Sequence, residues 1–270
     1  MTDSENPKVT LDLICQDEEE MIEQCIGFLL KLANAIAYTT EFVIVDGGSI
    51  DKTIDIINDM KDDRFRIFEN PWPGFAAQRN FAKSKSRGEW SFMAAADSTS
   101  TDSIYEMING LIDVGDDIAA YSFPKIHLVH DTEHMYDKSR DPIMALYRNM
   151  PDLVWGGEGL ENPMFNGTRI IQHPKHFNFP WQRYVPEVTM IHFAELKSEE
   201  ARVRKTMKYA KLANSRWFGR TEEQIRKAIV DARCTVDPTG DVFHAGYKIC
   251  PVSKYYQDIK FYNRMKEVKG

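Results

Sequence analysis

Short apolar runs and helical patterns alternate through the first hundred residues, and this alternation constrains the fold more than any other feature of the chain. Runs rich in β-branched and aromatic residues predict strands at residues 9–15, 41–45, 65–68 and 90–94. Apolar side chains at helical spacing lie between these runs, at residues 21–32, 51–60 and 75–84. Strands that alternate with helices predict a mostly parallel sheet with right-handed crossovers, whose ligands bind at the carboxyl ends of the strands.

The acidic segment after the first expected strand is interpreted as the start of a helix. An aspartate there accepts hydrogen bonds from the N–H groups of the first turn, so Asp17 is the expected N-cap. Residues 18–20 are all glutamate, and negative charge is favourable at a helix N-terminus.

The second half of the chain has a less regular pattern. Residues 119–129 suit one or two strands, and residues 188–193 suit a further short strand. Residues 142–168 are rich in Gly, Pro and Asn, so we expect a loop-like segment that forms a wall of the site.

Two helices are expected near the C-terminus. Ser198 is the expected cap of a basic amphipathic helix that runs to about Asn214. Thr221 and Gln224 form a capping-box pattern, which predicts a second helix that ends at about Arg233.

Composition disfavours several classes of protein. The net charge is −7, whereas a general polynucleotide-binding protein needs a basic face. There is no apolar run near eighteen residues, so no transmembrane helix is expected. The N-terminal residues are polar and lack a signal-peptide core, and the four cysteines show no C-x-x-C pair. These features predict a cytoplasmic protein with reduced thiols.

Four segments of the first half carry the strongest functional signal. They are LICQDEE at residues 13–19, VIVDGGSIDKT at 43–53, GFAAQRNFA at 74–82 and GEWSFMAAAD at 88–97. Each segment is weak by itself. Together, in this order, they resemble glycosyltransferase family 2, and especially its lipopolysaccharide-core type, which shares the D-G-G-S form and the G-F-x-x-Q-R-N helix.

The resemblance implies a fold and an activity. The implied fold is a GT-A (Rossmann-like) α/β domain over residues 1–270, with a mostly parallel central sheet flanked by helices and a helical C-terminal part. Residues 1–115 would form the nucleotide-binding half and residues 116–270 the acceptor-side half. The implied activity is inverting transfer of a sugar from a nucleotide-sugar donor, with a UDP-sugar favoured, to the hydroxyl of a glycan, lipid-linked or other acceptor. A nucleic-acid acceptor stays open.

The same resemblance implies which residues contact the nucleotide: Cys15, Asp17, Asp46, Gly47, Arg79, Asn80, Ala96 and Asp97. Asp46 ends an expected strand, and the two glycines after it let a ligand approach the backbone closely. The alternative is that Asp46 only ends the strand. Arg79 is long enough to reach the base or the diphosphate, although it would also suit a solvated helix face.

The metal motif of the family is incomplete in this chain. The family's D-x-D holds a divalent cation, Mn²⁺ or Mg²⁺, which neutralises the leaving diphosphate. Here Ala95 stands at the first carboxylate position, Asp97 at the second, and Ser98 where an acidic neighbour is usual. Three alternatives follow: Asp97 holds the cation with help from elsewhere, the cation binds weakly without nucleotide, or the protein works without metal. His192, in MIHF at residues 190–193, is the candidate second ligand.

Two glutamates are candidates for the catalytic base. WGGEGLE at residues 155–161 resembles the family's W-x-G-x-V-H-E, with Leu160 in place of the histidine. Glu161 matches the general base by position, and inversion requires a base on the acceptor hydroxyl. Glu158 is the rival, and both would also suit an exposed loop.

Basic residues follow the predicted strand at 188–193. Lys197 comes first, and Lys205 and Lys208 of the following basic helix resemble residues that help to hold the diphosphate, although a solvated helical face is the favoured interpretation. His127, His130 and His134 do not fit the spacing of a structural zinc site. The departures at Ala95 and Leu160 also suit a second function, a catalytically silent relative that binds a nucleotide sugar or a glycan.

Overall fold

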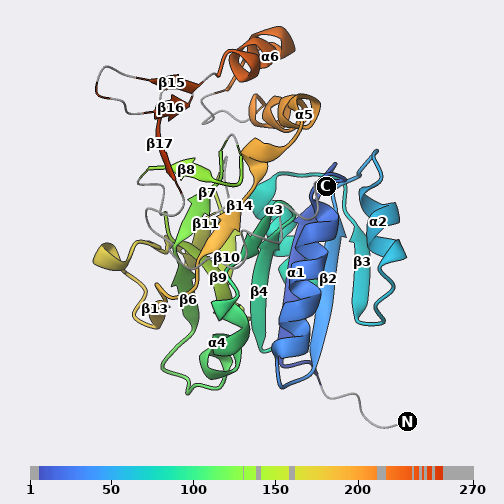
Figure 1. Cartoon of the computed structure of the whole chain (residues 1–270). Coiled ribbons are helices and arrows are strands. Elements are labelled where there is room, and N and C mark those ends of the chain that lie inside the picture. Colours follow the sequence, from blue (N-terminus) through green and yellow to red (C-terminus); the bar gives the residue numbers. More distant parts are fainter. Residues whose placement is uncertain are drawn as a thin grey trace.

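A seven-stranded sheet forms the centre of the molecule in the computed structural model (Figure 1). The structure describes residues 6–129, 131–137, 141–157, 162–211, 217–232, 234–236, 239, 242–244 and 247–251. The strand order is β13-β6-β9-β4-β1-β2-β3. In chain order these strands are β1 (Val9–Cys15), β2 (Thr40–Asp46), β3 (Phe65–Glu69), β4 (Trp90–Ala95), β6 (Ala120–Phe123), β9 (Ile143–Arg148) and β13 (Gln182–Tyr184).

Most neighbouring strands of this sheet are parallel. Strand β1 pairs in parallel with β2 and β4, as do β2 with β3 and β6 with β13. Strand β9 is antiparallel to both β4 and β6. The expected α/β fold with a mostly parallel sheet is therefore confirmed.

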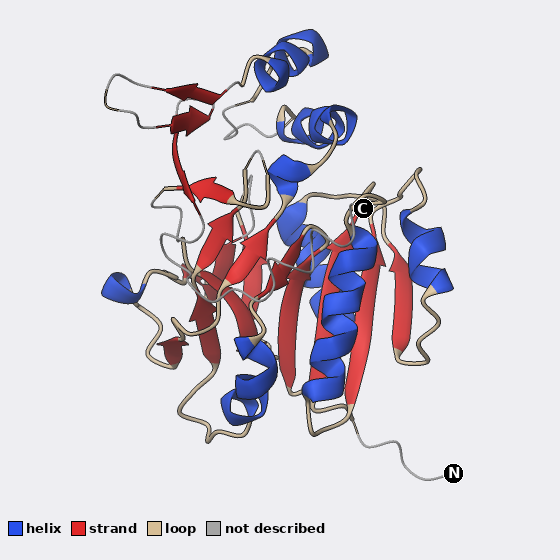
Figure 2. Ribbon diagram, in the orientation of Figure 1, coloured by secondary structure: helices blue, strands red, loops and turns tan. Residues whose placement is uncertain are grey.

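Helices cover both faces of the sheet (Figure 2). They are α1 (Ile22–Ala35), α2 (Thr53–Asp59), α3 (Phe75–Lys85) and α4 (Ser103–Ile112). Phe42 and Ile44 of β2 belong to the same buried cluster as α1 and α4, whereas Val43 and Val45 pack with Ala82 of α3. Successive side chains of a strand point to opposite faces, so one apolar strand supplies two cores.

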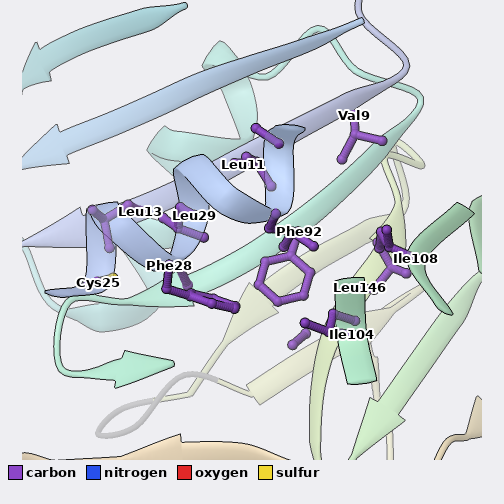
Figure 3. Close-up of a cluster of buried hydrophobic side chains, with 14 of the residues drawn as sticks. Val9, Leu11, Leu13, Cys25, Phe28, Leu29, Phe92, Ile104, Ile108 and Leu146 are labelled. Atoms are coloured by element: carbon purple, nitrogen blue, oxygen red, sulfur yellow. The ribbon is translucent and has the colours of Figure 1, made fainter. Parts of the chain in front are cut away.

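The larger core lies between α1 and the sheet (Figure 3). Phe28 and Leu29 of α1 meet Leu11 of β1 and Phe92 of β4, and Ile108 of α4 extends the cluster. Each such side chain contributes about 1.5–3 kcal/mol when it is fully buried. This packing fixes the carboxyl ends of β1, β2 and β4 relative to one another.

Smaller elements surround the sheet. A three-stranded sheet has the order β5-β14-β7, and a second three-stranded sheet and a four-stranded sheet have the orders β10-β11-β12 and β15-β16-β17-β8. Their bounds are β5 (Ser98–Ser100), β7 (Lys125–His127), β8 (His134–Tyr136), β10 (Leu153–Gly156), β11 (Asn162–Phe165), β12 (Thr168–Arg169), β14 (Met190–His192), β15 (Cys234–Val236), β16 (Val242–His244) and β17 (Tyr247–Pro251).

The C-terminal part contains α5 (Glu199–Tyr209) and α6 (Glu222–Val230) together with β15, β16 and β17 (Figure 1). Both expected caps are confirmed. The Ser198 hydroxyl accepts a hydrogen bond from the N–H of Ala201, and Thr221 with Gln224 forms the capping box. The helices are shorter than expected and end at Tyr209 and Val230. Among the described helices, none has the length and apolar character to cross a bilayer.

Two expectations about secondary structure were wrong, and one helix was not anticipated. Helix α1 begins at Ile22, and Asp17 is no N-cap but has a positive φ of 57°. The reason is long-range: the Asp17 N–H donates to the Ser49 hydroxyl, and its carboxylate accepts from the Ile50 N–H. Residues 142–168 were expected to be a loop but supply β9, β10, β11 and β12, and α4 was not expected at all.

Candidate functional site

A cavity of about 350 Å³ lies where β1 and β4 end. Its lining includes five of the residues that the sequence singled out as ligands of nucleotide or metal: Cys15, Arg79, Ala96, Asp97 and His192. The sheet brings Cys15 and Ala95 to one edge because β1 and β4 run in parallel register, with Ile14 opposite Ala95. This edge is where open α/β sheets bind ligands.

Four other predicted contacts do not line the cavity: Asp17, Asp46, Gly47 and Asn80. The carboxylate of Asp46 accepts hydrogen bonds from the N–H groups of Gly48 and Ser49, at 3.1 Å and 3.0 Å, and from the Ser49 hydroxyl. Asp46 therefore closes the turn that ends β2, with Gly48 at a φ of +88°. Its contact with a nucleotide stays a prediction.

Gly47 supports the cavity wall from behind. Its N–H donates to the Cys15 carbonyl at 2.8 Å. A Cβ atom at this position would lie 2.6 Å from the indole ring of Trp72, which lines the cavity. Only glycine leaves room for this contact, so the second residue of the D-G-G-S segment positions an aromatic wall.

Arg79 is buried rather than on a solvated helix face. Its side chain is 3% exposed, and its Nη1 lies 3.3 Å from Oδ1 of Asp12 on β1. The hydroxyl of Tyr147 donates to Oδ2 of the same carboxylate at 3.2 Å. Burial raises the pKa of Asp12 to about 6, against the opposing attraction of Arg79. The pair ties α3 to β1 beneath the cavity.

Asn80 has a structural partner in the cavity wall. Its amide donates to the carbonyl of Trp155 at 2.7 Å and accepts from the Trp155 N–H at 2.8 Å. Trp155 lines the cavity and lies in β10. Asn80 therefore holds β10 against α3, a role that the local sequence did not indicate.

Asp97 is the centre of a buried ionic cluster. Both Lys197 and Lys205 contact its Oδ2; the Lys197 Nζ lies at 3.0 Å, and Lys205 donates a hydrogen bond. The Nε2 atom of His192 lies 3.3 Å from Oδ1. Burial alone would raise the pKa of Asp97, but these two ammonium groups and His192 hold it well below the usual range.

Glu18 is the second carboxylate of the cluster, and sequence reasoning missed it. It forms an ion pair with Lys197, and its Oε1 lies 3.7 Å from the Lys205 Nζ. Burial and the neighbouring Asp97 raise the pKa of Glu18, although both lysines oppose this. The sequence feature that could have identified Glu18 was the acidic run at residues 17–20, which was assigned to the start of a helix.

The β5-β14-β7 sheet places two histidines in a row beside Asp97. Ser98 is paired with His192, and His192 with His127. The Nδ1 atoms of the two rings are 2.8 Å apart, so one ring donates to the other. Burial, together with His192 and Lys125, lowers the pKa of His127 to about 2, so this imidazole is neutral.

Helix α5 closes the site from the C-terminal side. Lys208 contacts Asp17 at 3.2 Å, and the ring of Tyr209 stacks on Phe75 of α3 with centroids 5.6 Å apart. The N–H of Ser198 donates to Glu20 at 2.7 Å. The acidic loop after β1 is thus the docking surface for this helix.

The residues around Asp97 do not fit a divalent cation. Asp97 and His192, the two predicted ligands, are close together, but cationic side chains already contact the carboxylate, and the side chain of Ala95 has no oxygen. In the described ranges, no group of three or more His, Cys, Asp and Glu is placed to hold a metal ion. His130 lies outside the described residues, and His134 pairs with Asp131 instead.

The two candidate bases, Glu158 and Glu161, also lie outside the described residues. Their flanks are described: β10 ends at Gly156 and pairs with β11, which begins at Asn162. The preceding Trp155 lines the cavity. Their assignment as bases stays a prediction.

The sheet with helices on both faces and a cavity at its carboxyl edge has the architecture of the GT-A fold. The model of the family "Glycosyl transferase family 2" matches residues 13–183, more than half of the sequence, and the chain belongs to this family. The expected family and fold are therefore confirmed.

Individual relatives are more distant. Over 119 residues, the chain is 31% identical to the lipopolysaccharide core biosynthesis glycosyltransferase LpsC of Rhizobium meliloti. The aligned stretch covers 43% of this chain and 42% of LpsC. An uncharacterized glycosyltransferase of Haemophilus influenzae is 32% identical over 88 residues, or 31% of this chain and 35% of that protein. The chain thus matches less than half of either relative's length.

A solved structure supports the fold. The crystal structure of S. aureus TarS 1–349 superposes with a TM-score of 0.51 and 14% sequence identity, over 83% of this chain and 69% of TarS 1–349. At this identity the likeness concerns the arrangement of helices and strands.

Proposed function

We propose that the chain transfers a sugar from a nucleotide-sugar donor, with a UDP-sugar favoured, to a hydroxyl acceptor with inversion. The observation that carries this proposal is the cavity at the ends of β1 and β4, whose lining combines Cys15 and Trp72 with Lys205 and Lys208. An apolar and aromatic wall suits a base and ribose, and ammonium groups suit a diphosphate. Membership of family 2 supports the same activity.

A second cavity offers a place for the acceptor. It measures about 600 Å³ and shares His127, His192, Lys205 and Tyr209 with the first. Arg220, whose guanidinium lies 5.7 Å from the ring centroid of Trp217, is part of its lining. We assign the acceptor hydroxyl to the boundary of the two cavities, beside His192. The acceptor is a glycan, a lipid-linked glycan or another hydroxyl compound.

Inversion by direct displacement needs a base that removes the proton from this hydroxyl, and we assign this role to Glu161. Glu161→Gln should lower the transfer rate about 100-fold or more and leave the affinity for UDP unchanged. If Glu158→Gln shows this pattern instead, the base is three residues earlier. Equal rates for both variants and the wild type would remove both glutamates from the mechanism.

Binding of a nucleotide is the first test of the proposal. UDP-, GDP-, CMP- and dTDP-sugars are screened by thermal shift, because a ligand of the native state raises the melting temperature. Ala95→Leu, which adds bulk inside the cavity, should abolish the shift; Ala37→Leu, a matched change at an exposed position, should preserve it. The proposal fails if no nucleotide binds, or if both variants bind equally well.

One observation favours a catalytically silent binding protein as the second candidate: Ala95 removes a carboxylate from the motif. Release of UDP from a bound UDP-sugar, with water or glycans as acceptor, distinguishes the two. Tight binding without any release of UDP would support the silent relative.

A further inference from the structure

We propose that lysine ammonium groups of this chain hold the donor's diphosphate in place of a divalent cation. The inference rests on the proposed function, since it concerns how the same cavity binds its nucleotide. Its central residues are Lys205 and Lys208 of α5, with Lys197 as the fixed counter-charge of the neighbouring carboxylates.

The first observation is that both carboxylate oxygens of Asp97 already have cationic or imidazole partners. Lys197 and Lys205 both contact Oδ2, and His192 lies against Oδ1 at 3.3 Å. To reach Oδ2, a divalent cation would have to displace Lys197 or Lys205 from Asp97. Both ammonium groups would still lie nearby and repel it. Mg²⁺ and Mn²⁺ bind through several oxygen ligands at close range.

The second observation is that no other carboxylate completes a metal site here. Ala95 presents a methyl group where the family motif has its first aspartate. Glu18, the nearest other acid, is paired with Lys197 and lies 3.7 Å from Lys205. Two acids and two lysines neutralise one another, which leaves no excess of negative charge to attract a cation.

The third observation is the charge of the cavity wall. Its charged residues are the cationic Arg79, Lys125, Lys205 and Lys208 and the anionic Glu18 and Asp97. Four cationic and two anionic side chains thus line the cavity, and Asp12 and Asp17, which pair with Arg79 and Lys208, lie outside this lining. Charge-assisted hydrogen bonds from cationic groups to phosphate oxygens are the strong kind.

The three lysines differ in burial, and this difference assigns their roles. Lys197 is 3% exposed and fixed between Glu18 and Asp97. Lys205 and Lys208 are 25% and 27% exposed, lie three positions apart on α5 and both line the cavity. Residues at this spacing project from the same side of a helix. Lys205 can turn to a phosphate because Lys197 stays in contact with Asp97, and Lys208 can turn because its partner Asp17 still accepts the N–H of Ile50.

The test measures UDP affinity of the full chain by calorimetry, in EDTA and in Mn²⁺. We expect the two dissociation constants to agree within about threefold. A loss of affinity of about tenfold or more in EDTA, restored by Mn²⁺, would overturn the inference and leave the proposed function intact. Absence of UDP binding in both buffers would overturn the proposed function, and the inference with it.

Lysine variants identify the group that replaces the metal. Lys205→Met should weaken UDP about tenfold or more, the scale of one lost charged hydrogen bond, yet leave uridine, which has no phosphates, unaffected. Lys205→Arg should restore most of the affinity. Lys211→Met removes the same charge at an exposed position beyond α5 and should bind UDP as the wild type does. Equal UDP affinity of Lys205→Met, Lys208→Met and wild type would contradict the assignment.

The reverse change gives an independent readout. In the double variant Ala95→Asp/Lys205→Met, a carboxylate is added and the competing ammonium is removed. Bound Mn²⁺ is measured by electron paramagnetic resonance in the presence of UDP. We expect the double variant with UDP to bind more Mn²⁺ than UDP binds without protein, and the wild type with UDP to bind no more than UDP does without protein. Strong Mn²⁺ uptake by the wild type would refute the proposal.

Discussion

The buried pair of Asp12 and Arg79 gives a prediction whose sign distinguishes two physical pictures. If the attraction of Arg79 dominates, Asp12 is ionised in the folded protein at all accessible pH values. If burial dominates, the pKa of Asp12 lies above its ordinary value, as the structure indicates with a rise from 3.8 to about 6. The perturbation that separates the pictures is Asp12→Asn, which keeps the shape and the hydrogen-bonding oxygen.

The magnitude follows from the two pKa values. An acid with a higher pKa in the folded state binds its proton more tightly when folded. Its contribution to stability is fully present below the unfolded pKa and is lost as the pH rises through the folded pKa. A rise from 3.8 to about 6 corresponds to about 3 kcal/mol in total. About 2 kcal/mol of this should be lost between about pH 4.5 and about pH 7.5.

The assay is urea unfolding of the wild type and Asp12→Asn at these two pH values. We expect the stability of the wild type relative to the variant to fall by about 2 kcal/mol as the pH rises. Other acids cancel in this difference, and Asp59→Asn, an exposed position on α2, controls for the change of net charge. A relative stability that rises with pH would refute the reasoning, because it would mean that Arg79 lowers the pKa of Asp12.

Three further predictions concern residues that shape the site. Asn80→Ala leaves the N–H and carbonyl of Trp155 without their partner and should destabilise the fold by about 2–3 kcal/mol in urea unfolding; no loss would contradict the contact. Gly47→Ala brings a methyl group 2.6 Å from Trp72, so we expect a cost of about 1–3 kcal/mol and a weaker thermal shift with UDP. Ser198→Ala removes the cap of α5 and should cost about 1 kcal/mol, measured by the thermal midpoint, whereas Ser198→Thr, which keeps the hydroxyl that also donates to Glu20, should retain most of it.

The sheet was predictable because its signal is local. The runs at residues 9–15 and 41–45 consist mostly of apolar, β-branched and aromatic side chains, as strands buried on both faces require; the polar exceptions are Thr10, Asp12 and Glu41. Helix α3 also begins at Phe75, where its apolar spacing predicts. In these segments propensity, periodicity and burial all favour the same structure.

The errors lie where distant contacts decide the structure. Asp17 is a residue type that commonly caps helices, yet its hydrogen-bond partners are Ser49 and Ile50, more than thirty positions along the chain. The segment at residues 142–168 contains turn-forming residues, but β9 adds to the edge of β4 and β10 pairs with β11. Strands β10 and β11 have four residues each, and so short a segment carries little periodic signal.

The candidate site was predictable as a set of residues but not as an arrangement. Asp97, His192 and Lys205 were all named from sequence motifs, whereas their mutual contact depends on α5 returning to the end of β4. Lys197 appeared only as part of a motif, and Glu18 only as part of a helix start. No local pattern indicates that these two form a buried ion pair.

The docking of α5 has a consequence for the order in which the molecule is made. Lys205 meets Asp97 across 108 positions of the chain, and Lys197 and Lys208 meet Glu18 and Asp17 across 179 and 191 positions. Contacts of such high sequence separation form late, because a long loop must close before they contribute. On the ribosome β1, β2, β3 and β4 emerge long before these lysines do, whereas β13 emerges shortly before them. We therefore expect a nascent chain to form the parallel β4-β1-β2-β3 part of its sheet early and to bind a nucleotide only once α5 has left the exit tunnel.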